Sequence, residues 1–133
     1  IKSLHYKNSS SYTKGINRAT NHPLPFIPAA SINNEVRFEP SIKGLEDSYI
    51  KVGVTNTFKQ ARFDNFETQT NGYTLLDAGI GTSIATKKGS FNIWVTGQNL
   101  LNKVYYNHLS RYKPVGIYNP GRNITFGIAV PFL

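Results

Sequence analysis

Apolar and polar residues alternate along most of the chain, in segments separated by turn-forming residues. In residues 73–84, Leu76, Ala78 and Ile80 share one parity, while Asp77 and Gly79 occupy the other. A period of two residues places apolar side chains on one face of a β-strand, so these segments predict strands. The predicted strands are 31–39, 49–58, 73–84, 90–102 and 124–132, with a weaker sixth strand in 1–8. No segment has a helical period, and the predicted fold class is all-β with antiparallel strands.

Two positions in the segment 90–102 depart from simple alternation. The parity slips near Gly97, where Leu100 and Leu101 follow one another, and this slip predicts a β-bulge. Trp94 falls on the polar parity of its strand. The indole ring is therefore expected either on the polar face of the sheet or in a locally shifted register.

The connections between the predicted strands alternate in length. The long ones are 14–28, 60–72 and 105–121, and the short ones are 40–47 and 86–89. Successive connections of an antiparallel meander lie at opposite ends, so the long loops should gather at one end. This arrangement is typical of a transmembrane β-barrel, although a soluble sandwich of two sheets stays an open alternative. Tyrosines near strand ends would form an aromatic girdle in a barrel: Tyr49, Tyr73, Tyr105 and Tyr106.

Composition and charge narrow the functional classes. The formal net charge is +8, but the basic residues lie in or beside connections, and no five-residue run of like charge occurs. This distribution favours basic loops on a β structure over a nucleic-acid footprint. The absence of cysteine excludes a disulfide framework, a thiolate metal site and a cysteine nucleophile. Asp64 and Glu67 share a loop without an evident acid–base arrangement, so we expect no enzyme activity, cofactor or metal site.

Several motifs near the C-terminal end resemble TonB-dependent outer-membrane receptors. Residues 99–106, which run from Asn99 to the Tyr105–Tyr106 pair, resemble the NLFDKxYY element of that family. The motif Asn119–Pro120–Gly121–Arg122–Asn123 resembles the lead-in to the last barrel strand. Residues 24–28 resemble an LPxIPP stretch, and the alternation up to Phe132 is similar to the aromatic-terminated assembly signal, although Leu133 follows it. The resemblance covers residues 24–133.

The resemblance implies a barrel of about twenty-two strands, closed by an N-terminal plug that carries a TonB box. Residues 1–133 are expected to be the C-terminal portion of that barrel, with about five to six strands and neither plug nor TonB box. A start at Ile1 rather than methionine fits a fragment or a processed product. The implied location is the bacterial outer membrane, and the implied partners are lipid, the rest of the barrel with its plug, and the TonB–ExbB–ExbD complex.

The function implied by the resemblance is energised import of a scarce small-molecule ligand, an iron chelate of the siderophore type or haem. A glycan-importing receptor of the same family is one alternative. The other is a soluble β domain that binds an anionic polymer through its basic loops. A nucleic acid is not an expected partner.

The candidate ligand-binding residues lie in the last long connection. Arg111 and Lys113 would attract an anionic ligand, while His108, Tyr112 and Tyr118 offer a hydrogen bond or a stacking face. The blander interpretation is that these are ordinary polar side chains of a barrel loop.

The motif residues and the barrel topology give further expectations. Arg122 is expected to pair with a lumen carboxylate such as Asp77 or to order the loop, and Gly121 is expected to adopt a positive φ in a turn set by Pro120. The turn 86–89 would face the periplasm, and the connections 60–72 and 105–121 the outside. The residues expected to face lipid are Ile124, Phe126, Ile128 and Val130, and those expected to face the lumen are Thr125, Gly127 and Ala129.

Overall fold

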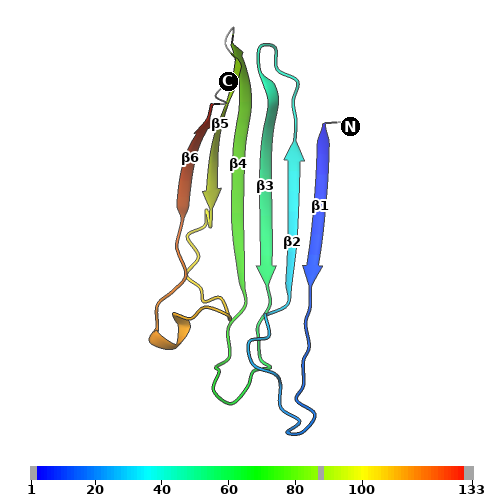
Figure 1. Ribbon diagram of the computed structural model, residues 1–133, viewed down its shortest axis with the longest axis vertical. Coiled ribbons are helices and arrows are strands. Elements are labelled where there is room, and N and C mark those ends of the chain that lie inside the picture. The colour runs from blue at the N-terminus through cyan, green and yellow to red at the C-terminus, as the bar shows by residue number, and fades with distance from the viewer. Residues whose placement is uncertain (1–2, 87–88, 131–133) are drawn as a thin grey trace.

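The chain folds into a single antiparallel sheet of six strands (Figure 1). The computed structural model describes residues 3–86 and 89–130. The strands are β1 (Leu4–Ser11), β2 (Ser31–Phe38), β3 (Glu46–Thr57), β4 (Tyr73–Thr86), β5 (Gly89–Gln98) and β6 (Asn123–Ala129), and the short 3-10 helix η1 spans Lys113–Val115. Each strand pairs with the next one along the chain, in the order β1-β2-β3-β4-β5-β6. The predicted all-β, antiparallel fold class is confirmed.

In the part of the chain that the structure describes, no helix has the length and apolar character needed to cross a membrane.

One face of the sheet is apolar across all six strands because the pairing register aligns apolar residues in rows. The central row consists of Leu4, Phe38, Ile50, Ile80, Val95 and Phe126. These side chains are exposed or half-buried, and Phe126 is 76% exposed. Among residues 3–86 and 89–130, no apolar side chain is buried. The described sheet therefore has no hydrophobic core of its own, and its apolar face is uncovered.

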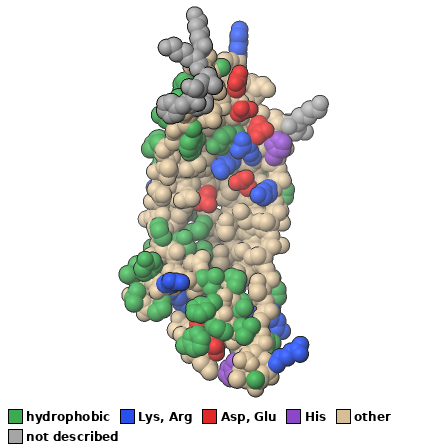
Figure 2. Space-filling view, in the orientation of Figure 1, with side chains coloured by type: hydrophobic (Ala, Val, Ile, Leu, Met, Phe, Trp, Pro, Cys, Tyr) green, Lys and Arg blue, Asp and Glu red, His purple; other side chains and the backbone are tan. Residues whose placement is uncertain are grey.

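The opposite face carries the polar parity. Its central row consists of His5, Arg37, Lys51, Gly79, Thr96 and Thr125. Glu39, which directly follows β2, contacts two members of this row. Its carboxylate lies 3.3 Å from Nε2 of His5 on the edge strand β1 and 2.7 Å from Nε of Arg37 on β2. Figure 2 shows charged and histidine side chains gathered over the half of the sheet nearest the short connections. The sheet is thus amphipathic, with one apolar and one polar face.

The long and short connections lie at opposite ends of the sheet, as the alternation of loop lengths predicts (Figure 1). The long connections 12–30, 58–72 and 99–122 share one end. The connection 39–45 lies at the other end, together with Thr86 and Gly89, which are the described residues of the predicted turn 86–89. Lys87 and Lys88 of that predicted tight turn lie outside the described residues.

The bulge predicted near Gly97 does not lie within β5, but the backbone slips by one residue just after that strand: the N–H of Leu100 donates to the carbonyl of Leu76 at 2.8 Å, although the continued register would place Asn99 opposite Leu76. β5 stays in register with both neighbouring strands at Gly97 and ends at Gln98. The two adjacent leucines belong to the turn that follows, in which a Cβ on Gly97 would lie 2.5 Å from Cδ2 of Leu100. Leu100 therefore folds back over the strand it has just left. A register shift within the paired strands lies in β3, between Glu46 and Tyr49.

A second row on the polar face alternates aromatic rings with glycines. Tyr49 of β3 pairs with Gly81 of β4, which pairs with Trp94 of β5, which pairs with Gly127 of β6. A Cβ on Gly81 would lie 2.6 Å from the Tyr49 ring, and one on Gly127 would lie 2.1 Å from Trp94. Each ring covers the glycine beside it. Trp94 is in regular register with both neighbouring strands and lies on the polar face, which is the first of its two predicted alternatives.

The predicted aromatic girdle is wrong for two of its tyrosines. Tyr49 pairs with Gly81 and Tyr73 shares the parity of Asp77, so both rings belong to the polar face. Proximity to a strand end gives no information about facing, whereas the residue's parity does.

Candidate functional site

The three long connections meet in a group of polar side chains at their end of the sheet. We call Gln60, Glu67, Thr70, His108 and Lys113 the loop cluster; within it Gln60, Thr70 and His108 are buried. Backbone hydrogen bonds pair Gln60 with Thr70 inside connection 58–72. The Gln60 amide nitrogen donates to the carbonyls of Ile27 at 2.9 Å and Pro28 at 3.2 Å. These bonds hold connection 12–30 against connection 58–72.

His108 joins connection 99–122 to connection 58–72. Its side chain is 2% exposed, and its Nδ1 lies 2.7 Å from Oγ1 of Thr70. Lys113 donates from Nζ to the same hydroxyl at 2.7 Å and to the carbonyl of Thr68. The hydroxyl of Thr70 is therefore the shared hydrogen-bond partner of His108 and Lys113, both from connection 99–122.

Glu67 links all three connections. Its Oε1 accepts the backbone N–H of Phe26 at 3.1 Å, and its Oε2 accepts that of Asp64 at 3.1 Å. The same Oε1 lies 3.6 Å from Nε2 of His108, which is too long for a hydrogen bond. Nε2 is buried and has no hydrogen-bond partner in the structure.

The charge state of the loop cluster follows from burial. Burial lowers the pKa of His108; Lys113 lowers this pKa further, and the opposing attraction of Glu67 does not reverse the shift. Burial likewise lowers the pKa of Lys113, while Glu67 acts to raise it. Because the ordinary histidine pKa is already about 6.5, His108 is predominantly neutral at neutral pH.

The Asn-rich motif closes the base of connection 99–122. Asn99, which has a φ of 48°, is buried and exchanges two hydrogen bonds with Lys103: Nδ2 donates to the carbonyl at 2.9 Å, and Oδ1 accepts the N–H at 2.8 Å. Its Nδ2 also donates to the carbonyl of Pro120 at 3.3 Å. Its backbone N–H donates to Oδ1 of Asp77 at 2.8 Å. A single asparagine thus fixes both ends of the loop to the sheet.

The expectation for Gly121 is wrong, and so is the first of the two alternatives for Arg122, pairing with Asp77. Gly121 does not have a positive φ; instead, a Cβ there would lie 2.7 Å from Oδ1 of Asn102, so the glycine is needed for close approach. That Asn102 oxygen accepts the backbone N–H of Arg122 at 3.0 Å. Among the described residues no ion pair joins Arg122 to Asp77, whose carboxylate already accepts the Asn99 N–H.

The other motif residues brace the loop. Asn119 donates from its backbone to the carbonyl of Tyr105 at 3.0 Å and accepts the N–H of Asn107 at 2.8 Å. The ring of Tyr105 lies 4.3 Å from that of Tyr73. Tyr118 stacks on Tyr106 at a ring-centroid distance of 4.3 Å. Asn123 begins β6, whereas Phe132 lies outside the described residues.

The structure divides the candidate ligand-binding residues into two groups. Arg111, Tyr112 and Tyr118 line an open hollow of about 610 Å³ in connection 99–122. His108 and Lys113 belong instead to the loop cluster, with their polar atoms directed at connection 58–72. A guanidinium and two phenol rings suit an anionic or aromatic ligand.

Sequence reasoning missed Thr70 and gave Glu67 no role. One feature of the sequence pointed to the proximity of Glu67 and His108. These residues lie in two long connections, and the alternation of connection lengths places both connections at the same end of the sheet.

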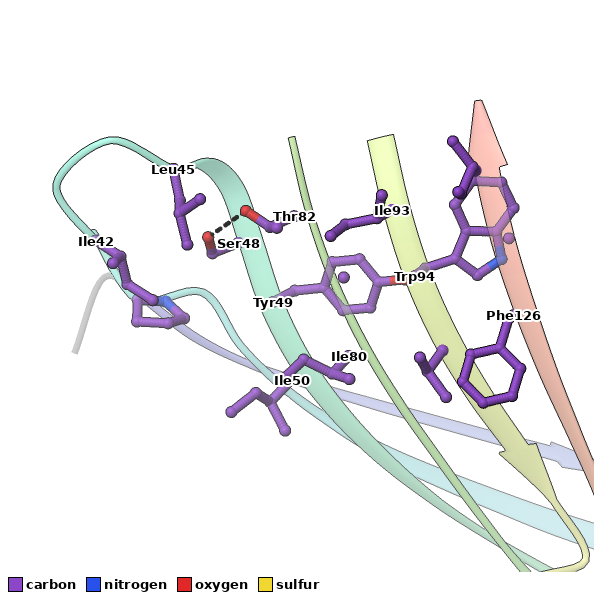
Figure 3. Close-up of a pocket in the computed structure, with 15 residues that line it drawn as sticks. Ile42, Leu45, Ser48, Tyr49, Ile50, Ile80, Thr82, Ile93, Trp94 and Phe126 are labelled. Atoms are coloured by element: carbon purple, nitrogen blue, oxygen red, sulfur yellow. Dashed lines mark hydrogen bonds between the residues drawn. The ribbon is translucent and has the colours of Figure 1, made fainter. Parts of the chain in front are cut away.

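A second hollow lies on the apolar face (Figure 3) and has a volume of about 440 Å³. Its walls include Ile50, Ile80 and Phe126. The two hydroxyls that enter it, on Ser48 and Thr82, bond to each other at 2.7 Å. This hollow is therefore a depression in the uncovered apolar face, with its polar groups satisfied internally.

A scan of protein-family models finds none that matches the chain, and a search of curated proteins finds no match either. The case for a function therefore depends on the sheet, its loops and the motifs they contain.

Proposed function

We propose that this chain is part of the β-barrel of a TonB-dependent outer-membrane receptor that imports an iron chelate or haem. The observation that carries the proposal is the apolar face, which is uncovered across all six strands while no described apolar side chain is buried. Exposed apolar patches larger than a few hundred Å² are rare on soluble monomers. Lipid covers such a face without a second layer of protein.

The edges and the polar face support the same proposal. Strands β1 and β6 each lack a partner on one side within the described part of the chain. Further strands of the receptor would pair with both edges, because unpaired backbone groups are not tolerated in a bilayer. The polar face would then line the lumen and meet the plug, whose TonB box engages the TonB–ExbB–ExbD complex. This assembly follows from the motif resemblance.

The loops favour an anionic ligand within this class. In the proposed orientation the long connections face the outside of the cell, and the hollow containing Arg111, Tyr112 and Tyr118 is among the surfaces a ligand meets first. A cationic, aromatic hollow suits a negatively charged chelate or haem better than a neutral glycan, although a glycan-importing receptor is the alternative within the family.

The proposal is tested on the full-length protein in its native membrane. We expect it in the outer-membrane fraction, soluble only in detergent, with heat-modifiable gel mobility. Cells that express it should take up one member of a panel of ferric hydroxamates, ferric catecholates, ferric citrate and haem. A monodisperse protein in buffer without detergent would instead indicate the soluble polymer-binding domain, and uptake of oligosaccharides alone would indicate the glycan receptor.

Replacing Arg111 by serine should weaken binding of the transported chelate about two- to five-fold at low salt. The effect should largely disappear at high salt, because screening at about 0.15 M already acts over roughly 8 Å. Lys113 is not a suitable position for a second substitution, because its ammonium group bonds to Thr70 and Thr68 and its loss would disturb the loop cluster. Arg18→Ser, at an exposed position of connection 12–30, is the matched control. Equal affinity of the wild type and Arg111→Ser at every salt concentration would remove this hollow from the binding site.

A further inference from the structure

The hydrogen bonds of the loop cluster depend on the protonation state of His108. The ammonium group of Lys113 has only donors, so the Thr70 hydroxyl accepts from it. The hydroxyl proton is then free to point at Nδ1 of His108, 2.7 Å away. In this arrangement Nδ1 is the acceptor, and the single ring proton lies on Nε2, directed toward Glu67 at 3.6 Å.

A second proton on His108 disturbs this arrangement. Nδ1 would become a donor, and the Thr70 hydroxyl would have to accept from His108 and Lys113 at once. Its own proton would then need an acceptor elsewhere in a buried site, and an unmade buried hydrogen bond is costly. The imidazolium would also lie near the ammonium group of Lys113, which shares the Thr70 hydroxyl with it.

We propose that His108 is a proton-operated clasp, which holds connection 99–122 against connection 58–72 when neutral and releases it when protonated. The charged groups that act on His108 are Glu67 of connection 58–72 and Lys113 of its own connection. Connection 12–30 contributes the backbone N–H of Phe26, which bonds to Glu67 rather than to the ring. Glu67 attracts the imidazolium, but its oxygens already accept two backbone N–H groups.

The direction of the pH dependence follows from burial. The pKa of clasped His108 lies below the ordinary value of about 6.5, to which the released ring returns. Released His108 therefore binds protons more readily than clasped His108. The clasp is fully favoured above about pH 6.5 and is lost as the pH falls through the lowered pKa of the buried ring.

The clasp bears on ligand binding because His108 and Lys113 bracket Arg111 and Tyr112 in the sequence. Release would free the segment that lines the outer hollow. This consequence rests on the proposed function, whereas the clasp itself does not.

The clasp is tested by pulsed electron–electron double resonance, which measures the distance between two spin labels. The labels are attached to the variants Gln69→Cys and Val115→Cys, at two exposed positions. The measurement uses the full-length protein, with any cysteines outside this chain replaced. We expect a narrow distance distribution at about pH 7.5 and loss of the narrow component at about pH 5. The readout requires neither ligand nor transport, so its failure is distinguishable from failure of the proposed function.

Three variants test whether the pH-dependent change in distance comes from His108. His108→Asn keeps a hydrogen-bonding group near Nδ1 but cannot titrate, so its distribution should not change with pH. Thr70→Val removes the shared hydroxyl and should lose the narrow component at both pH values. His22→Asn, at an exposed position in connection 12–30, should respond as the wild type does. A wild type that stays narrow at about pH 5, or a His108→Asn protein that still responds, overturns the proposal.

Discussion

Replacing Gly127 by alanine is expected to destabilise the folded protein by about 1–3 kcal/mol, the range for an overpacked site. The added Cβ would lie 2.1 Å from Cε2 and Cζ2 of Trp94, so the indole must leave its place over β6. The measurement is equilibrium unfolding of the full-length protein in urea, followed by heat-modifiable gel mobility. Trp94 itself is not a suitable probe because its environment changes in the variant.

Gly53→Ala is the matched control for Gly127→Ala. Gly53 lies on the same polar face, and its added Cβ would approach only a backbone oxygen, at 3.9 Å. That variant should be neutral or slightly stabilising, because alanine reduces the freedom of the unfolded chain. In a Trp94→Ala background, Gly127→Ala should lose most of its penalty. An equal penalty in both backgrounds would show that contact with the indole is not the cause.

The strands and their faces could be predicted from the sequence because a period of two residues is a local signal. The alternation of loop lengths likewise predicted the two ends of the sheet. The exact register could not be predicted. Nothing near Gly127 in the sequence indicates that Trp94 covers it, since the pairing of β5 with β6 brings them together across connection 99–122.

The candidate site was predictable only in part, for the same reason. Sequence analysis selected the last long connection and its polar residues, and the structure places Arg111, Tyr112 and Tyr118 around one hollow. It could not separate His108 from that group, because the partner Thr70 lies 38 positions away. Gly121 shows the limit of local turn rules: a glycine after proline suggests a positive φ, but here the glycine is needed for close approach by Asn102.

Replacing Phe126 by arginine is expected to cost about 2–4 kcal/mol if the apolar face meets lipid. Phe126 is aligned through Val95 with Ile80, in the middle of the longest strand, so it should lie near the bilayer midplane. At that depth a charged side chain on the lipid face has no polar partner. Urea unfolding in lipid bilayers gives the change in folding free energy directly.

Thr125→Arg is the matched control because Thr125 is adjacent in β6 and lies on the polar face. If the polar face lines a water-filled lumen, this variant should cost about 1 kcal/mol or less, because the added charge stays in contact with water. Gly127 cannot serve this purpose, because any side chain there collides with Trp94. Phe126→Leu, which stays apolar, separates loss of the ring from gain of charge. A penalty for Phe126→Arg no larger than that for Thr125→Arg would argue that both faces meet water or protein. In that case a second sheet, rather than lipid, would have to cover the apolar rows.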